Sequence, residues 1–126
     1  MRPAIERLVD ATTGIDRWCS APDWTFSTQL GFAPNVEPFV LGDLERWAVV
    51  LAEFRDEAGQ PVLGGLEPLW GFACPLLLPE PEEHAFEFAE QLGRRAGWDR
   101  LVIAGLDAQS DLYFHTVRAL STIGTV

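Results

Sequence analysis

The residues best suited to covalent catalysis in this chain are two histidines, His84 and His115, and the potential nucleophiles Cys74 and Ser110. A serine or cysteine nucleophile needs a neighbouring base, and the base needs a third group that orients it. Neither histidine lies in a local motif that supplies such a group. We expect His84 to be exposed in the first turn of an acid-rich helix. No catalytic residue is therefore assigned from the sequence.

Metal-binding patterns are also incomplete. The histidines and cysteines match no zinc spacing, and the Asp-rich loop of an EF-hand is missing. A dense group of glutamates has two interpretations: a carboxylate pair for acid–base chemistry, or a solvated helix face favoured by the helix dipole. The neighbouring prolines favour the solvated face, and we expect no metal site. The group comprises Glu80, Glu82, Glu83, Glu87 and Glu90.

Glycine-rich phosphate loops are missing too, since the chain contains neither G-x-G-x-x-G nor a Walker-type loop. All nine basic residues are arginine, which excludes lysine Schiff-base chemistry and a phosphate-loop lysine. We attribute this arginine usage to genome composition, as in a GC-rich organism. The sequence indicates no cofactor bound by this chain alone.

The most distinctive segment runs from Leu66 to Leu76, where two prolines and a glycine fix an irregular backbone around large aromatic side chains. One interpretation is a ligand pocket. The other is an aromatic plug that seals the sheet against the following helix. Under the first interpretation, the predicted substrate-binding residues are Trp70, Gly71, Phe72 and Cys74.

Length and composition narrow the class of protein. A chain of 126 residues with 48% hydrophobic content predicts one globular domain. The net charge of −10 disfavours nucleic acid and membrane surfaces as partners. Cys19 and Cys74 are too isolated for a disulfide framework, so we expect buried free thiols. With no signal peptide or membrane-spanning run, these features predict a cytoplasmic protein.

The first half of the chain predicts a helix over Pro3–Val9, followed by an aromatic segment, Trp18–Asn35, that forms a loop or short helix over the core. Val36–Leu41 and Trp47–Phe54 are predicted strands. Both alternating faces of Trp47–Phe54 are apolar, which indicates a strand covered on each side. A hairpin loop containing Gly59 then leads to an antiparallel partner strand, Pro61–Leu66.

The second half predicts a helix, a strand and another helix. The first helix begins near Pro81 with an inward stripe of Ala85, Phe88, Ala89 and Leu92, widened by Phe86. Leu101–Leu106 has the pattern of a buried strand. The last helix is capped by Asp107 or Ser110 and turns Tyr113, Phe114, Val117 and Leu120 inward. The predicted fold class is therefore α/β (α+β): a mixed, partly antiparallel sheet with flanking helices. A single domain spans residues 1–126, with the aromatic segment 1–35 packed on the core 36–124.

Several of these segments carry a family resemblance. Pro68–Leu76, followed by Pro79-Glu80-Pro81, a helix and Trp98–Leu106, resembles the first half of FemAB-like proteins of the GNAT acyltransferase superfamily. Those proteins have two Pro-Leu pairs around a loop, then a helix, then W-D-x-L-x-L-x-G-L and another helix. Pro22–Thr28 is similar to their aromatic segment, so the similarity spans about residues 18–124.

The resemblance implies two tandem acetyltransferase-like folds, of which this chain is the first, a GNAT-like half. Acyl-CoA would then bind a second domain that this chain lacks. The nearest approach to the family's R/Q-x-x-G-x-G/A loop, Arg94–Asp99, ends in an aspartate and follows a helix instead of opening one. The chain is thus expected to be non-catalytic and to contribute to acceptor-substrate binding or to assembly with the second domain.

A different class of function also fits the sequence. A net charge of −10 with five tryptophans suits an acidic protein-interaction module, such as a bacterial immunity-type protein that binds a basic partner. Under either interpretation the expected partner is another protein or a second copy of the chain.

Overall fold

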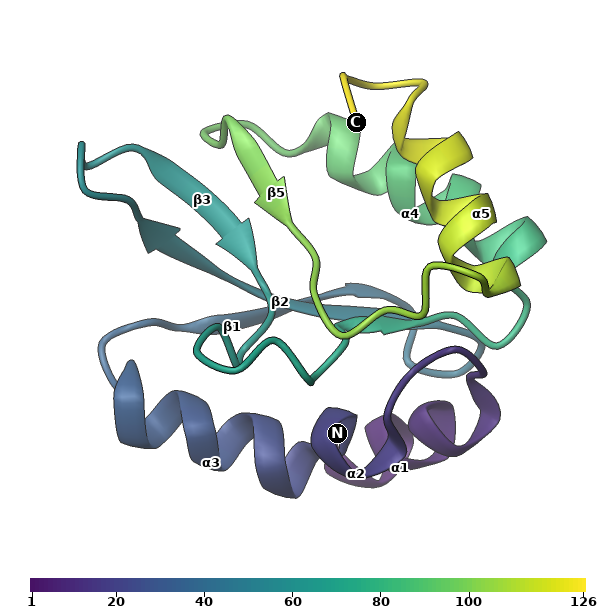
Figure 1. Cartoon of the computed structure of the whole chain (residues 1–126), viewed down its shortest axis with the longest axis horizontal. Coiled ribbons are helices and arrows are strands. Elements are labelled where there is room, and N and C mark those ends of the chain that lie inside the picture. Colours follow the sequence, from purple (N-terminus) through teal and green to yellow (C-terminus); the bar gives the residue numbers. More distant parts are fainter.

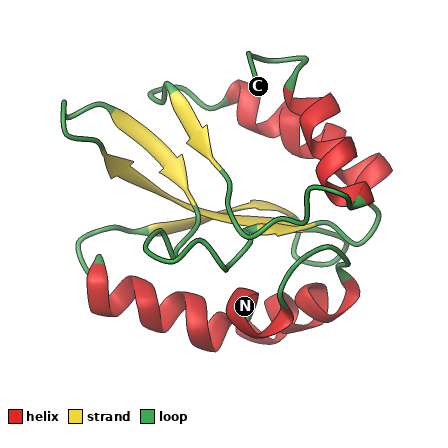
Figure 2. Ribbon diagram, in the orientation of Figure 1, coloured by secondary structure: helices red, strands yellow, loops and turns green.

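The sheet is organised around β2 (Ala48–Arg55), whose first five residues are buried. The computed structural model describes all residues 1–126 and places helices on both faces of this strand (Figures 1 and 2). Val49 and Leu51 belong to one core cluster, and Ala48, Val50 and Ala52 belong to a second. The prediction of a strand covered on each side is confirmed, because alternate side chains enter different cores.

Four further strands complete a mixed sheet. β1 (Pro38–Gly42) and β3 (Pro61–Gly64) pair antiparallel with β2, and the β2–β3 hairpin turns at Gly59, whose φ is +78°. The two-residue β4 (Leu76–Leu77) pairs with the start of β2, and β5 (Arg100–Val102) runs parallel to β3. The order β1-β2-β3-β5 confirms the predicted fold class.

Three helices cover one face of the sheet: α1 (Arg2–Ala11), α2 (Arg17–Ser20) and α3 (Pro22–Phe32). The predicted first helix is confirmed, and it buries Ile5, Leu8 and Val9. The segment predicted as a loop or short helix instead contains the eleven-residue α3. The apolar residues of α3 are distributed over all its sides, so the sequence shows no amphipathic period there.

The opposite face is covered by α4 (Pro81–Arg94) and α5 (Asp111–Leu120), which pack along each other. The predicted stripe of α4 is buried, although Phe86 is 40% exposed and does not extend it. None of the helices combines the length and the apolar content needed to cross a membrane.

The predicted inward face of α5 is wrong in part. Leu112, Thr116 and Ala119 are buried, whereas Tyr113 and Phe114 are 41% and 59% exposed. The buried face of α5 is displaced by about one residue from the predicted one. The small side chains of Thr116 and Ala119 let α5 approach α4 closely on this face.

The prediction of a buried strand over Leu101–Leu106 is also wrong. The strand covers only Arg100–Val102, and Val102 is 53% exposed. The reason is its position: β5 is the last strand in the sheet order, so its outer side has no neighbour.

Candidate functional site

The loop between β3 and β4 carries all four predicted substrate-binding residues, and the buried carboxylate of Glu67 sets its shape. Glu67 is 2% exposed. Its Oε2 accepts hydrogen bonds from the backbone N–H groups of Trp70 at 2.7 Å and Gly71 at 3.2 Å, and its Oε1 accepts one from Phe72 at 3.1 Å. A buried carboxylate is tolerated when such donors compensate it. The loop backbone is therefore held in one conformation before any ligand arrives.

A second anchor holds the end of the loop. The backbone N–H of Cys74 donates to the hydroxyl of Ser20, on α2, at 3.0 Å. Cys74 is only 2% exposed, and burial raises the pKa of its thiol to about 12. The structure thus brings Trp70, Gly71 and Phe72 together at the surface and places Cys74 in the core beneath them.

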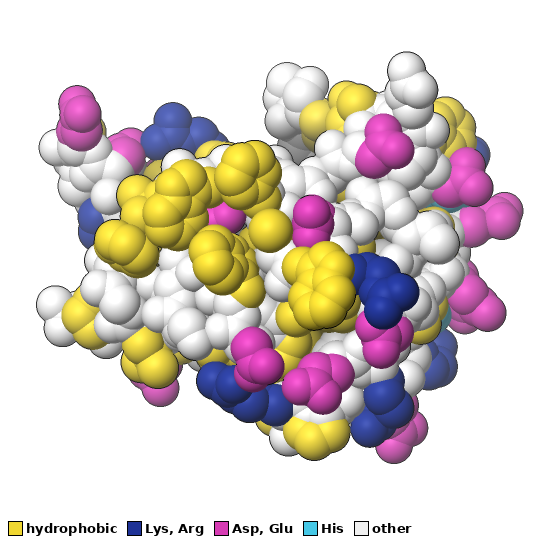
Figure 3. Space-filling model, turned by 60° about the horizontal axis from the view of Figure 1, so that its bottom comes forward, with side chains coloured by type: hydrophobic (Ala, Val, Ile, Leu, Met, Phe, Trp, Pro, Cys, Tyr) yellow, Lys and Arg dark blue, Asp and Glu magenta, His cyan; other side chains and the backbone are white.

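Trp70 and Phe72 lie on the outside of the molecule, with exposed fractions of 48% and 58%. The Trp70 ring lies 5.7 Å from that of Trp24 and 5.6 Å from that of Phe32, the latter edge to face. Figure 3 shows apolar side chains gathered on this face of the molecule. These rings do not seal the interior, so the aromatic-plug interpretation is wrong for them. We call this group, Trp24, Phe32, Leu69, Trp70 and Phe72, the aromatic surface.

The same loop lines an open hollow between two distant segments. Ile15 and Leu106 form an isolated antiparallel bridge, and the N–H of Asp107 donates to the carbonyl of Gly14 at 3.0 Å. This pairing brings the α1–α2 connection beside the β5–α5 connection. The resulting acidic hollow is lined by Gly14, Ile15, Asp16, Gly71, Phe72, Gly105, Leu106 and Asp107.

Each of the two carboxylates in the acidic hollow, those of Asp16 and Asp107, has one oxygen that accepts no hydrogen bond. One oxygen of Asp16 accepts from the N–H of Cys19 at 2.9 Å, and one oxygen of Asp107 accepts from that of Gln109 at 2.9 Å. Neither aspartate forms a salt bridge with an arginine or histidine. The pKa of the half-buried Cys19 thiol is raised by desolvation and then by the charge of Asp16. The two carboxylates therefore favour a cation in this hollow, which Phe72 also lines.

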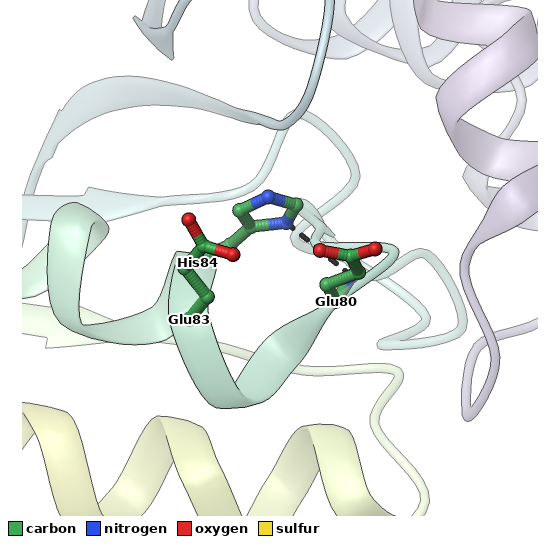
Figure 4. A group of neighbouring side chains, drawn as sticks. All are labelled: Glu80, Glu83 and His84. Carbon is green, nitrogen blue, oxygen red and sulfur yellow. Dashed lines mark hydrogen bonds between the residues drawn. The ribbon is translucent and has the colours of Figure 1, made fainter.

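The glutamate-rich end of α4 contains a different cluster. Ligand atoms of Glu80, Glu83 and His84 lie within 4.8 Å of one another (Figure 4). The prediction that His84 is exposed is wrong, because it is 3% exposed and stacks near the Trp47 ring. Its Nδ1 accepts the N–H of Glu80 at 3.3 Å. The imidazole thus satisfies a backbone donor at the helix start, the task of a capping group.

The remaining candidates for covalent chemistry are not paired. The Ser110 hydroxyl donates to the carbonyl of Asp107 and accepts the N–H of Tyr113, which makes it the N-cap of α5. The side chain of His115 packs edge to face against Phe114, and its Nδ1 is buried with no hydrogen-bond partner. Neither histidine hydrogen-bonds Ser110 or Cys74.

Sequence reasoning missed three residues that shape this region: Asp16, Glu67 and Asp107. Asp16 had a local signal, because aspartate often precedes a helix and here caps α2. Asp107 was predicted only as a possible cap. Their approach to the 67–74 loop depends on the bridge between Ile15 and Leu106, which no local pattern shows.

Comparison with known proteins adds no relative: no protein-family model, no curated protein and no solved structure matches this chain.

Proposed function

We propose that this chain is the non-catalytic first half of a GNAT/FemAB-like N-acyltransferase, which binds the acceptor amine and assembles with a second GNAT-like domain. The observation that carries the proposal is the acidic hollow, in which Gly71 and Phe72 lie with the carboxylates of Asp16 and Asp107. Acyl-CoA binds the second domain in this proposal. The assembly works in the cytosol.

The chemistry of the acceptor fits the hollow. An N-acyltransferase uses an amine, which is protonated near neutral pH and must be bound as an ammonium before it loses a proton. Two carboxylates without a cationic partner attract such a group. The hollow is open to solvent, so an amine at the end of a longer acceptor can reach it.

The order of elements supports the same proposal. The antiparallel strands β1, β2 and β3 are followed by the short β4, by α4 and by β5, which returns parallel to β3. This is the order of strand, loop, helix, strand and helix that the family resemblance implies. A right-handed crossover through a helix is the usual way to join parallel neighbours.

The aromatic surface is the proposed contact with the second domain. Large apolar groups gathered at a surface mark interfaces more often than isolated ones do. Glu67 holds the backbone of Trp70 and Phe72 in place, so little conformational freedom is lost when a partner covers them.

A second function, an immunity-type module that binds a basic protein, is favoured by one observation. The acidic hollow and the aromatic surface share Phe72, so one partner could bury the ring and pair its own arginine or lysine with Asp16 or Asp107. Binding of a free small amine separates the two functions, because an interaction module needs no affinity for one.

Calorimetry with a primary amine such as glycinamide tests the proposed function. The D16N/D107N double variant keeps the oxygen that accepts each backbone N–H and removes both charges. We expect it to bind glycinamide at least about tenfold more weakly, a loss of about 1.4 kcal/mol. Glu57→Gln, in the exposed β2–β3 loop, is the matched control and should bind normally. Equal affinity of the double variant and the control would refute the acceptor site.

A further inference from the structure

The acidic hollow is larger than the ammonium group that its two carboxylates attract. Its volume is about 580 Å³. Sites that hold a whole small molecule measure roughly 300–1,000 Å³. An ammonium group is close in size to a water molecule, which takes about 30 Å³. Most of the hollow is therefore left to other parts of the molecule that carries the amine.

Glycines give the hollow its shape. Gly14, Gly71 and Gly105 line it, and all three have positive φ angles, of +86°, +71° and +72°. A Cβ on Gly14 would lie 2.7 Å from the Cβ of Ser110, and one on Gly105 would lie 2.6 Å from the carbonyl oxygen of Phe72. Three connections of the chain therefore meet through their backbones, and the hollow is formed before a ligand arrives.

Three apolar side chains, those of Ile15, Phe72 and Leu106, also line the hollow. Ile15 and Leu106 are half-buried and pack against the core, whereas Phe72 is 58% exposed. The backbone N–H of Phe72 donates to Oε1 of Glu67 at 3.1 Å, which fixes where this side chain leaves the loop. An ammonium alone would leave this apolar surface in water. A ligand that covers it gains affinity from its burial.

The charged and apolar groups of the hollow are neighbours. Asp16 follows Ile15 directly, Asp107 follows Leu106 directly, and the bridge between Ile15 and Leu106 brings the two pairs together. Consecutive Cα atoms are only about 3.8 Å apart. A ligand that reaches both kinds of group therefore needs its ammonium and its apolar part on the same or adjacent carbon atoms.

We propose that the acceptor is the α-amino group of a residue with an apolar side chain, linked through its carbonyl as an amide. The ammonium lies at Asp16 and Asp107, and the side chain covers Phe72 and the exposed parts of Ile15 and Leu106. A free amino acid is excluded, because its own carboxylate would face the two aspartates. This inference rests on the proposed function, since it names the substrate class of the same hollow.

The test compares amides that differ only in their side chain. Calorimetry measures the affinity of the unmodified chain for glycinamide, leucinamide and asparaginamide, the last of which has a polar side chain similar in size to that of leucine. We expect leucinamide to bind at least about tenfold more tightly than glycinamide, because its side chain is partly buried. Asparaginamide should bind like glycinamide. Free leucine should bind at least about tenfold more weakly than leucinamide.

Two variants locate the apolar contact. Phe72→Ala should lower the preference for leucinamide over glycinamide to less than about threefold, since the largest apolar group in the hollow is removed. Phe114→Ala is the matched control. It removes a phenylalanine that is 59% exposed on α5, outside the hollow, and should keep the full preference.

The outcomes separate this inference from the proposed function. Equal affinities for leucinamide, asparaginamide and glycinamide would overturn the inference and leave the acceptor site in place. A full preference for leucinamide in Phe72→Ala would also overturn it, because the apolar contact would then lie elsewhere. No saturable binding of any amide at millimolar concentration would overturn the proposed function together with the inference.

Discussion

The carboxylate of Glu67 accepts a hydrogen bond of 2.7 Å from the backbone N–H of Trp70, so a buried charge positions an exposed aromatic residue. Two more backbone donors, from Gly71 and Phe72, complete its environment. The exposed part of the loop is thus tied to the interior by the side chain of Glu67, in addition to the bond between Cys74 and Ser20 at the end of the loop.

Glu67→Gln should therefore destabilise the protein. The amide of glutamine turns a donor toward backbone N–H groups that need an acceptor, and the loss should be about 1–3 kcal/mol. Chemical denaturation measures it, with Glu57→Gln, an exposed carboxamide substitution, as the control. If both variants unfold at the same denaturant concentration, Glu67 does not hold the loop.

Gly105 should tolerate no side chain. A Cβ there would lie 2.6 Å from the carbonyl oxygen of Phe72 and 2.6 Å from the carbonyl carbon of Ala73, and its φ is +72°. Overpacking costs about 1–3 kcal/mol, in addition to about 1–2 kcal/mol for a left-handed conformation. Gly97→Ala is the matched control, because its φ is +86° and nothing lies within 4 Å of the new atom. Equal unfolding free energies for the two variants would show that the loop does not pack on Gly105.

Asp43 should titrate well below a normal aspartate. The N–H of Arg46 donates to Oδ1 at 2.8 Å, and its guanidinium donates to Oδ2 at 3.0 Å. The backbone bond is the main cause that lowers the pKa from 3.8 to about 2. The resulting stabilisation is present above the unfolded-state pKa and is lost as pH falls from about 3.8 toward 2.

Carbon NMR of the carboxyl groups measures this titration. In Arg46→Gln the backbone N–H remains, so the pKa of Asp43 should rise only part of the way toward 3.8. A complete return to 3.8 would show that the guanidinium, and not the backbone, dominates.

The two thiols should differ in reactivity. Burial raises the pKa of Cys74 to about 12, so it stays protonated near pH 8 and is shielded from reagents. In the variant Cys19→Ser only the buried Cys74 remains, and a disulfide reagent should label it only after unfolding. In Cys74→Ser the remaining thiol is the half-buried Cys19, which should react slowly in the folded protein. Rapid labelling of native Cys19→Ser would contradict the buried position of Cys74.

The raised pKa also predicts a loss of stability in alkali. The neutral thiol of Cys74 is favoured in the fold, so its contribution is complete below about pH 9 and disappears as pH rises toward 12. Cys74→Ala should show a weaker decline than the parent over this interval, measured by denaturation at constant ionic strength.

The elements that could be predicted from the sequence are those with strong local patterns. β2 alternates two apolar faces, and α4 combines a proline start with a stripe that reaches Leu92. The sequence of α3 has no amphipathic period, because its own apolar residues lie on all sides of the helix. Two of them, Trp24 and Phe32, remain exposed.

The site could be predicted only in part. The unusual composition of their segment points to Trp70, Gly71 and Phe72, and the structure does bring them together. The same segment includes Cys74, but two positions after Phe72 the chain has already entered the core. The carboxylates of the acidic hollow come from residues 16 and 107, which meet through a long-range bridge that sequence spacing does not reveal.

One titration tests the central claim, that this chain holds the acceptor amine and not the acyl donor. Amide NMR spectra of the labelled chain are recorded with glycinamide and, separately, with acetyl-CoA. We expect glycinamide to shift the signals of Gly71, Phe72 and Asp107 along one saturable curve, and acetyl-CoA to produce no saturable shifts. A specific complex with acetyl-CoA, or amine-induced shifts confined to other parts of the chain, would contradict the claim.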